Sequence, residues 1–211
     1  MYIGDYLGRR QIYSPDKLAI IDVGQQPALE LTYRQMNERA NRLANWLRDV
    51  AGVQKGDRVL LLSDETLEKL LIWLGAWRMG AIICPLNIEL NEANLAELAA
   101  MIRPKIMFTH KELDGPKLTA GIDAPLIRFG QWKPATGNDP QDQYFTALAH
   151  GAKAADIPER NNAEDISCMF CTSGTTSKPK IVVYDHCAYW LSGLDTLDIL
   201  GLEANDKTLE Y

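Results

Sequence analysis

Apolar and polar residues alternate in blocks along this chain, and the blocks predict strands and helices in turn. Two short apolar runs, at residues 17–23 and 28–33, flank a turn rich in Gly, Gln and Pro, which is typical of two strands joined by a hairpin. Thr32 and Gln35 have the spacing of a capping box. Apolar residues then recur at helical spacing over 36–50. The first quarter of the chain therefore predicts a hairpin followed by an amphipathic helix with one core face.

The next segment repeats this order of strand and helix. A compact apolar run at 58–62 predicts a strand, and Asp64 is expected to cap a helix that presents Leu70 and Trp77 among its core positions. Asn91 is expected to cap a third helix, which Pro104 stops. Further strands are predicted at 81–86, 105–109 and 125–129. Strands that alternate with helices of this length indicate parallel βαβ units, and hence an α/β fold with a parallel sheet flanked by helices.

The pattern changes between 130 and 164, where Pro, Gly, Asn, Asp and Gln dominate and only a short helix at 144–149 is predicted. Apolar runs at 166–171 and 181–184 predict two more strands. Asp185 then opens a helix that ends near Gly201, and residues 209–211 resemble the start of another strand. We expect four parts: an N-terminal hairpin region (1–33), a βαβ subdomain (34–130), an irregular connection (131–164), and a hairpin with its following helix (165–211).

Charge and composition narrow the possible partners. The 211 residues carry a net charge of −6, and lysines and arginines are scattered, which argues against nucleic acid or an anionic membrane as the main partner. No apolar run approaches the roughly 18–20 residues that span a bilayer. The N-terminus lacks the basic and then apolar pattern of a secretory signal, so the cytoplasm is the expected location.

The four cysteines include a Cys-x-x-Cys pair, Cys168 and Cys171, which could indicate redox chemistry or half of a zinc site. This pair lies in a predicted strand, where residues three apart face opposite sides of a sheet. A zinc site would also need His186 and Cys187, which are adjacent and poorly spaced for one ion. We therefore expect buried, reduced cysteines.

The segment with the richest chemistry is 171–180, Cys-Thr-Ser-Gly-Thr-Thr-Ser-Lys-Pro-Lys, between two predicted strands. Hydroxyls, lysines and a glycine that permits close backbone approach suit a polyphosphate ligand. A Walker A loop is excluded, because Pro179 precedes Lys180 and the residues that follow favour a strand rather than a helix. On composition alone, a solvated turn is the alternative.

This segment resembles the phosphate-binding loop of the adenylate-forming superfamily, which includes acyl-CoA synthetases, amino-acid adenylation domains and luciferases. His186 stands where the family often has a histidine, whereas Ser177 and Ile181 replace family glycines. A serine in a left-handed conformation at 177 would cost about 1–2 kcal/mol. Three upstream stretches also match the family in the correct order, namely 32–47, 53–59 and 80–87.

The resemblance implies a function and a site. Such enzymes join a carboxylate to ATP, with Mg²⁺, to give an acyl-adenylate, and then transfer the acyl group to a thiol, usually that of coenzyme A. The fold implied is part of the large N-terminal domain of an adenylate-forming enzyme. The residues expected to bind the ATP phosphates are Thr172, Ser173, Gly174, Thr175, Thr176, Ser177, Lys178 and Lys180.

Later family motifs, for adenine, ribose, the hinge and a catalytic lysine, are not found before Tyr211. We therefore expect the N-terminal part of a larger carboxylic acid–CoA ligase that is inactive by itself. Two alternatives stay open: an amino-acid adenylation domain of a peptide synthetase, and a non-catalytic α/β binding module derived from the family.

The remaining conspicuous residues have structural explanations. His186 is expected to help begin the last helix rather than to contact a substrate, and His110 and His150 are expected at the surface. The tryptophans at 46, 73 and 77 fit the core faces of helices better than a stacking platform. Asp64 and Glu65 lie where acidic residues favour a helix start, so they are assigned no catalytic role.

Overall fold

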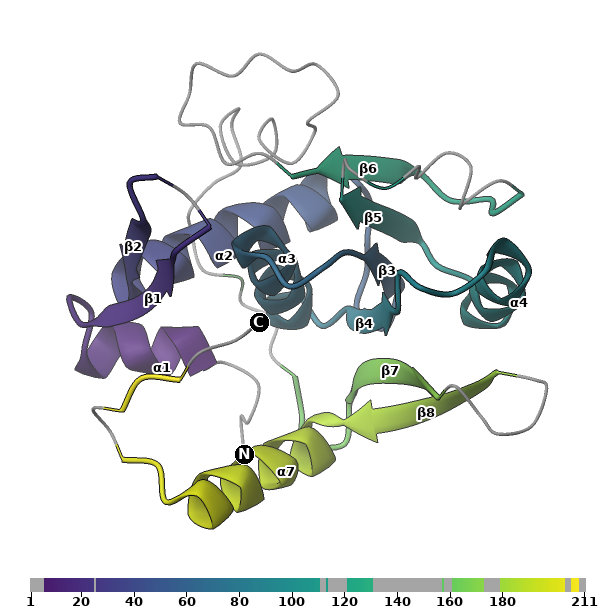
Figure 1. The fold of residues 1–211 in the computed structure, drawn as a ribbon. Helices are drawn as coiled ribbons and strands as arrows, with labels where there is room; N and C mark the ends of the chain where they lie inside the picture. Colours follow the sequence, from purple (N-terminus) through teal and green to yellow (C-terminus); the bar gives the residue numbers. More distant parts are fainter. Residues whose placement is uncertain are drawn as a thin grey trace.

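A six-stranded, mostly parallel sheet lies at the centre of the fold (Figure 1). The computed structural model describes residues 6–24, 26–110, 113, 121–130, 157, 161–172, 179–203 and 206–208. The strands of the sheet are β3 (Arg58–Leu62), β4 (Ile82–Leu86), β5 (Ile106–His110), β6 (Leu126–Phe129), β7 (Ile166–Thr172) and β8 (Lys180–Asp185). Their order is β6-β5-β3-β4-β7-β8, and all neighbours are parallel except the antiparallel pair β7 and β8. The predicted α/β fold with parallel βαβ units is confirmed.

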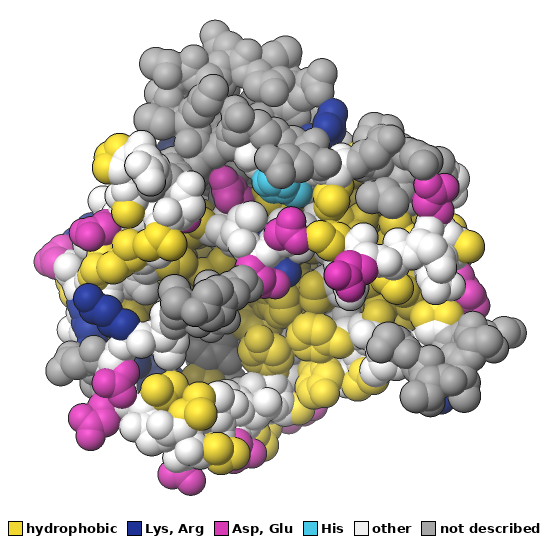
Figure 2. Space-filling view, in the orientation of Figure 1, with side chains coloured by type: hydrophobic (Ala, Val, Ile, Leu, Met, Phe, Trp, Pro, Cys, Tyr) yellow, Lys and Arg dark blue, Asp and Glu magenta, His cyan; other side chains and the backbone are white. Residues whose placement is uncertain are grey.

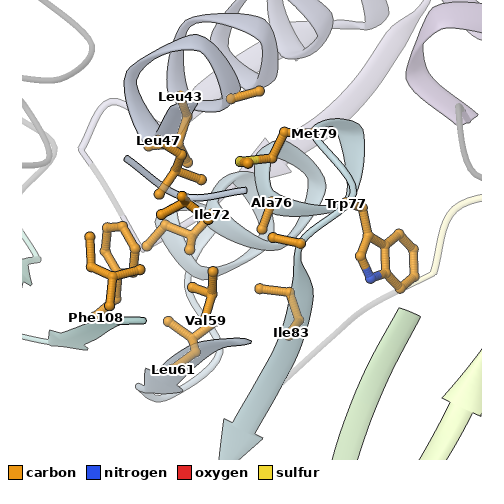
Figure 3. Close-up of a cluster of buried hydrophobic side chains, with 14 of the residues drawn as sticks. Leu43, Leu47, Val59, Leu61, Ile72, Ala76, Trp77, Met79, Ile83 and Phe108 are labelled. Atoms are coloured by element: carbon orange, nitrogen blue, oxygen red, sulfur yellow. The ribbon is translucent and has the colours of Figure 1, made fainter. Parts of the chain in front are cut away.

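The two faces of the sheet bury different helices. Val59 and Leu61 of β3 pack with α2 (Tyr33–Asp49) and α3 (Leu67–Arg78), as the close-up in Figure 3 shows. Leu60 and Leu62 of the same strand pack with α4 (Glu92–Ile102) on the opposite side. Successive side chains of a strand point to opposite faces, so the continuous apolar run of β3 supplies both cores.

The N-terminal region forms a small layer of its own against α2. The strands β1 (Leu18–Asp22) and β2 (Leu29–Thr32) pair in antiparallel fashion, as predicted. The predicted capping box is present: the Gln35 N–H donates to Thr32 Oγ1 at 3.3 Å, and the Thr32 N–H donates to Gln35 Oε1 at 2.9 Å. A further helix, α1 (Tyr6–Tyr13), was not predicted, and its buried Leu7 joins Leu31 and Met36.

Several details of the sequence-based assignment are corrected. Thr66, not Asp64, caps α3, because its hydroxyl accepts the Lys69 N–H at 3.1 Å while Asp64 lies exposed two residues earlier.

Three residues differ in burial from their predictions. Val50 is 69% exposed, since α2 ends at the preceding residue. Leu70 is partly exposed rather than in the core. His110 is half-buried and packs edge-on against Phe129, with a ring-centroid distance of 5.7 Å.

The last helix, α7 (His186–Leu200), begins and ends at the predicted residues. Asp185 is its N-cap and accepts the Ala188 N–H at 2.6 Å, and Gly201 closes it in the left-handed conformation. No helix among the described residues is long and apolar enough to cross a membrane. The helix predicted at 144–149 and the strand predicted at 209–211 lie outside the described residues.

Candidate functional site

The candidate site lies where the hairpin of β7 and β8 opens. β7 runs parallel to β4, so its last residue, Thr172, lies at the edge of the sheet where the parallel strands end. Thr172 is paired in register with Lys180, the first residue of β8, and both are exposed. Ligands of open α/β sheets bind outside the carboxyl ends of the strands, which is the edge that these two residues occupy.

The structure thus brings Thr172 and Lys180 together as the two ends of the predicted phosphate loop. The other predicted contacts lie outside the described residues, namely Ser173, Gly174, Thr175, Thr176, Ser177 and Lys178. No carboxylate among the described residues forms an ion pair with Lys180.

Hydrogen bonds at the base of the hairpin join its two strands to each other and fasten β7 to α3. The pairing of β7 with β8 shifts register between Ile166 and Cys168, and Ser167 occupies this irregularity. The Ser167 hydroxyl, fully buried, lies 3.1 Å from the carbonyl oxygens of both Tyr184 and Asp185, to which it donates. From α3, Trp77 Nε1 donates to the Ser167 carbonyl oxygen at 2.8 Å. These bonds fix the hairpin at the end opposite to the candidate loop.

The sequence did not predict these hydrogen bonds at the base of the hairpin. Trp77 was expected in a helix core, which its burial confirms, but its indole N–H also binds a strand 90 residues further along the chain. Asn161 extends the arrangement, since its Nδ2 donates to the Trp77 carbonyl oxygen at 2.5 Å. No local spacing links these three residues, so a single sequence carries no signal for the contact.

Both faces of the hairpin pack on the rest of the fold near the candidate loop. Met169, Cys171 and Ile181 pack against the core on the α4 side of the sheet. On the other side, the Phe170 ring lies 6.0 Å from the Trp73 ring and 5.6 Å from the Tyr184 ring, between centroids. The strands that lead into and out of the loop are therefore held from both sides.

His186 begins α7, as predicted, but it is also buried, which was not predicted. Its ring meets Trp77 edge-on at 5.4 Å between centroids, and its backbone N–H donates to the Asp165 carbonyl oxygen at 3.0 Å. Neither ring nitrogen has a hydrogen-bond partner among the described residues. Burial lowers the pKa of His186, although the negative charges of Asp165 and Asp185 oppose that effect. The ring is therefore held neutral inside the protein and is far better suited to structure than to contact with substrate.

Asp165, whose negative charge acts on His186, forms an ion pair with Lys55. Its Oδ2 lies 2.6 Å from Lys55 Nζ. Burial acts to raise the pKa of the Asp165 carboxyl, but hydrogen bonds from Lys55 and from the Asn162 N–H outweigh burial and lower the pKa below its ordinary value. This pair links the start of β7 to the turn that precedes β3.

The cysteines are free, as expected, but only two of them are fully buried. Cys84 and Cys168 are buried, whereas Cys171 and Cys187 are half-buried. Burial raises the pKa of Cys168, and it raises the pKa of Cys171 to about 11. Thiols with raised pKa values stay protonated at neutral pH, which does not suit redox catalysis or metal binding. Within the described residues, no cluster of His, Cys, Asp or Glu is arranged to hold a metal ion.

Residues 9–211 match the model of the family described as AMP-binding enzyme. The chain belongs to this family. An acetyl-coenzyme A synthetase of Xanthomonas campestris pv. campestris is 30% identical to it, over 92% of this chain and 33% of that protein. Tyrocidine synthase 3 of Brevibacillus parabrevis is 29% identical over 82% of this chain, which corresponds to 2% of that protein.

Solved structures of the family agree with the fold. The crystal structure of ATP-bound MatB from Rhodopseudomonas palustris is 26% identical, with a TM-score of 0.75, and the match covers 94% of this chain and 38% of that one. This chain spans about a third of the length of the acyl-CoA synthetases that it matches. The resemblance seen in the sequence, to the N-terminal part of adenylate-forming enzymes, is confirmed.

Proposed function

We propose that this chain supplies the N-terminal part of an ATP-dependent carboxylic acid–CoA ligase, and that the loop between β7 and β8 binds the phosphates of ATP. The observation that carries the proposal is the pairing of Thr172 with Lys180 at the mouth of the hairpin, with the hydroxyl-rich family motif between them. The pairing of the two loop ends at the carboxyl edge of the sheet supports the proposal, because ligands of open α/β sheets bind outside that edge.

The proposed reaction has two steps, adenylation of the carboxylate and transfer of the acyl group to a thiol. A carboxylate oxygen of the substrate attacks the α-phosphorus of ATP, the bond to the β-phosphate oxygen breaks, and pyrophosphate leaves. The thiol of coenzyme A then attacks the acyl carbonyl carbon and its proton passes to solvent. The bond between that carbon and the phosphate oxygen breaks, and AMP leaves. Repulsion between two anions dominates the first barrier, so positive charge and oriented hydrogen-bond donors near the leaving pyrophosphate lower it.

We assign the loop residues different roles in binding the phosphates, according to their chemical type. Lys180 and Lys178 are assigned to charge stabilisation of the β- and γ-phosphates. Thr172, Ser173, Thr175, Thr176 and Ser177 are assigned as hydroxyl donors, and Gly174 as the position that lets the backbone approach. Mg²⁺ is expected to arrive with the nucleotide, as the resemblance to the family implies.

Lys180→Ala in a polypeptide that carries this chain together with the rest of the ligase tests the assignment. Carboxylate-dependent exchange of pyrophosphate into ATP should slow at least about tenfold, the equivalent of roughly 1.4 kcal/mol of lost transition-state stabilisation. Lys105→Ala is the matched control, since Lys105 is exposed just before β5, at the opposite edge of the sheet. An unchanged exchange rate in the Lys180 variant would contradict the proposed role.

An amino-acid adenylation domain is the second candidate, favoured by the similarity to tyrocidine synthase 3. The same exchange assay separates the candidates when it is run with a panel of acids. Exchange that depends on an amino acid, with transfer to a carrier protein, supports the second candidate. Exchange with simple carboxylic acids, followed by thioester formation with coenzyme A, supports the ligase. A folded protein that exchanges with neither would instead be a non-catalytic module.

A further inference from the structure

Three asparagines form a buried polar stripe on α2. Asn37, Asn41 and Asn45 are spaced four apart, which places them one above another on the same side of the helix, and all three are buried. An amide buried without a partner costs free energy, so such side chains are hydrogen-bonded in folded proteins. Asn45 Nδ2 donates to the Asn41 carbonyl oxygen at 2.8 Å, within the helix. The Oδ1 atoms of the other two asparagines accept hydrogen bonds from α3.

The donor on α3 is Arg78, the last residue of that helix. Its Nη1 lies 2.6 Å from Asn37 Oδ1, and it also donates to Asn41 Oδ1. Many charged side chains lie at the surface, as Figure 2 shows for one face, whereas Arg78 is half-buried against α2. Hydrogen bonds from a charged donor are stronger than neutral ones, so these two bonds hold the last turn of α3 on the asparagine stripe.

The same turn of α3 is bonded to two further parts of the fold. The Trp77 side chain points away from the other labelled residues of Figure 3, and its Nε1 donates to the Ser167 carbonyl oxygen of β7 at 2.8 Å. The Gly80 carbonyl oxygen accepts the Gly56 N–H at 2.8 Å, from the turn before β3. The end of α3 therefore joins α2, β7 and the turn before β3.

We propose that Arg78 is a positioning residue for the hairpin of β7 and β8. Successive residues of a helix lie about 100° apart, so a shift of the last turn that breaks the Arg78 contacts also moves Trp77. The indole would then lose its alignment with the Ser167 carbonyl oxygen, in the strand that leads into the candidate loop. Arg78 acts here through Trp77, not by touching a substrate. The proposal rests on the proposed function in taking this loop as the phosphate site.

The indole proton of Trp77 tests the positioning in the 211-residue chain alone. Arg78→Met removes the guanidinium and keeps a long side chain, and the indole N–H, whose NMR signal Trp77→Phe identifies, should then exchange with solvent at least about tenfold faster. Arg78→Lys should restore part of the protection, because an ammonium group can still donate to the two asparagine oxygens. Arg42→Met is the matched control, since Arg42 lies on α2 in an ion pair with the exposed Glu38, and it should leave the indole signal unchanged.

A role in overall stability alone predicts a different result. Loss of global stability speeds the exchange of all well-protected protons alike, including the backbone amides of β5, which lies beyond β3 and β4 from the hairpin. We expect the Trp77 indole to lose at least about ten times more protection than those amides. Equal losses would overturn the proposal. If Arg78→Met does not fold, Asn41→Ala removes one of the two acceptors, and the same comparison decides.

The consequence for the reaction is measured in a polypeptide that carries this chain together with the rest of the ligase. Arg78→Met should lower kcat/KM for ATP in pyrophosphate exchange at least about fivefold and change KM for the carboxylate by less than about twofold, because only the phosphate loop is displaced. Unchanged exchange in the variant would overturn the role in the reaction. Selective loss of indole protection, in a protein that catalyses no exchange before substitution, would support the positioning of the hairpin and count against the proposed function.

Discussion

His186 places a titratable group inside the junction between α7 and the sheet. The ring is 1% exposed, has no hydrogen-bond partner among the described residues, and lies beside Trp77, Asp165 and the Lys55 ammonium. Burial lowers its pKa below the ordinary 6.5, so the unfolded chain binds more protons than the folded one in the window just below that value. Stability therefore falls as the pH drops from about 6.5 towards the folded-state pKa.

We expect His186→Phe to remove this part of the pH dependence. Phenylalanine keeps an aromatic ring against Trp77 and removes two buried polar atoms that have no partner, a change that can be neutral or stabilising. Urea unfolding at pH 7.5 and pH 5.5 measures the effect, and Ser192→Ala, on the exposed part of the same helix, is the control. The prediction fails if the phenylalanine variant loses as much stability between the two pH values as the unchanged protein.

Thr66 and Asp64 provide a second comparison at the residue scale. Thr66→Ala should destabilise the fold by about 1 kcal/mol, because it removes the side chain that accepts the Lys69 N–H at the start of α3. Asp64→Ala should cost less than about 0.5 kcal/mol, since the Asp64 side chain is exposed and does not cap the helix. Chemical denaturation of the two variants distinguishes the caps, and a larger loss for Asp64→Ala would reverse the assignment.

The hairpin of β7 and β8 depends on α3 for its position. Trp77→Phe removes the indole donor and leaves the Ser167 carbonyl oxygen without that partner, which should cost about 1–3 kcal/mol in addition to lost packing. Trp73→Phe is the matched change on the same helix, because Trp73 contacts Phe170 and Tyr189 through ring packing and is only half-buried. Unfolding free energies should fall clearly more for Trp77→Phe, and equal losses would show that the hydrogen bond contributes little.

The elements of this fold could be predicted where local chemistry determines them. The capping box at Thr32 and the continuous apolar run of β3 specify their own structures, and both predictions are confirmed. α1 was missed because it has only eight residues, and its buried Leu7 is held by a tertiary contact with Leu31 and Met36 that the local sequence does not reveal. Asp64 and Thr66 are both good cap residues, and only the course of the backbone after β3 selects Thr66.

Part of the candidate site could likewise be predicted from the sequence, and part could not. The composition of 172–180 leaves a phosphate ligand and a solvated turn open, and the resemblance to the family favours the phosphate ligand. The facing positions of Thr172 and Lys180 agree with a hairpin between two strands. The contacts that hold this hairpin join Trp77 to Ser167 and His186 to Asp165, and they depend on tertiary packing across the sheet. The pattern of α7 predicts a helix, but it does not reveal that most of its large apolar side chains stay exposed.

At the scale of the whole molecule, the proposed phosphate loop would supply only one part of a nucleotide site. In the family that the sequence resembles, adenine and ribose contacts come from later motifs, and this chain spans about a third of its ligase relatives. We therefore expect the 211-residue chain alone to bind ATP with a Kd of about 1 mM or weaker, equivalent to roughly −4 kcal/mol or less favourable. It should catalyse no carboxylate-dependent pyrophosphate exchange.

Titration calorimetry of the chain with MgATP, together with inorganic triphosphate as a second ligand, checks this expectation. If the loop alone contributes the affinity, triphosphate should bind about as well as MgATP, and Lys180→Ala should weaken both while Lys105→Ala weakens neither. Micromolar binding of MgATP with no binding of triphosphate would show that the described fold contacts the nucleoside. The binding determinants would then lie elsewhere than in the hairpin of β7 and β8, because a loop that recognises only phosphates cannot distinguish the two ligands by their base and sugar.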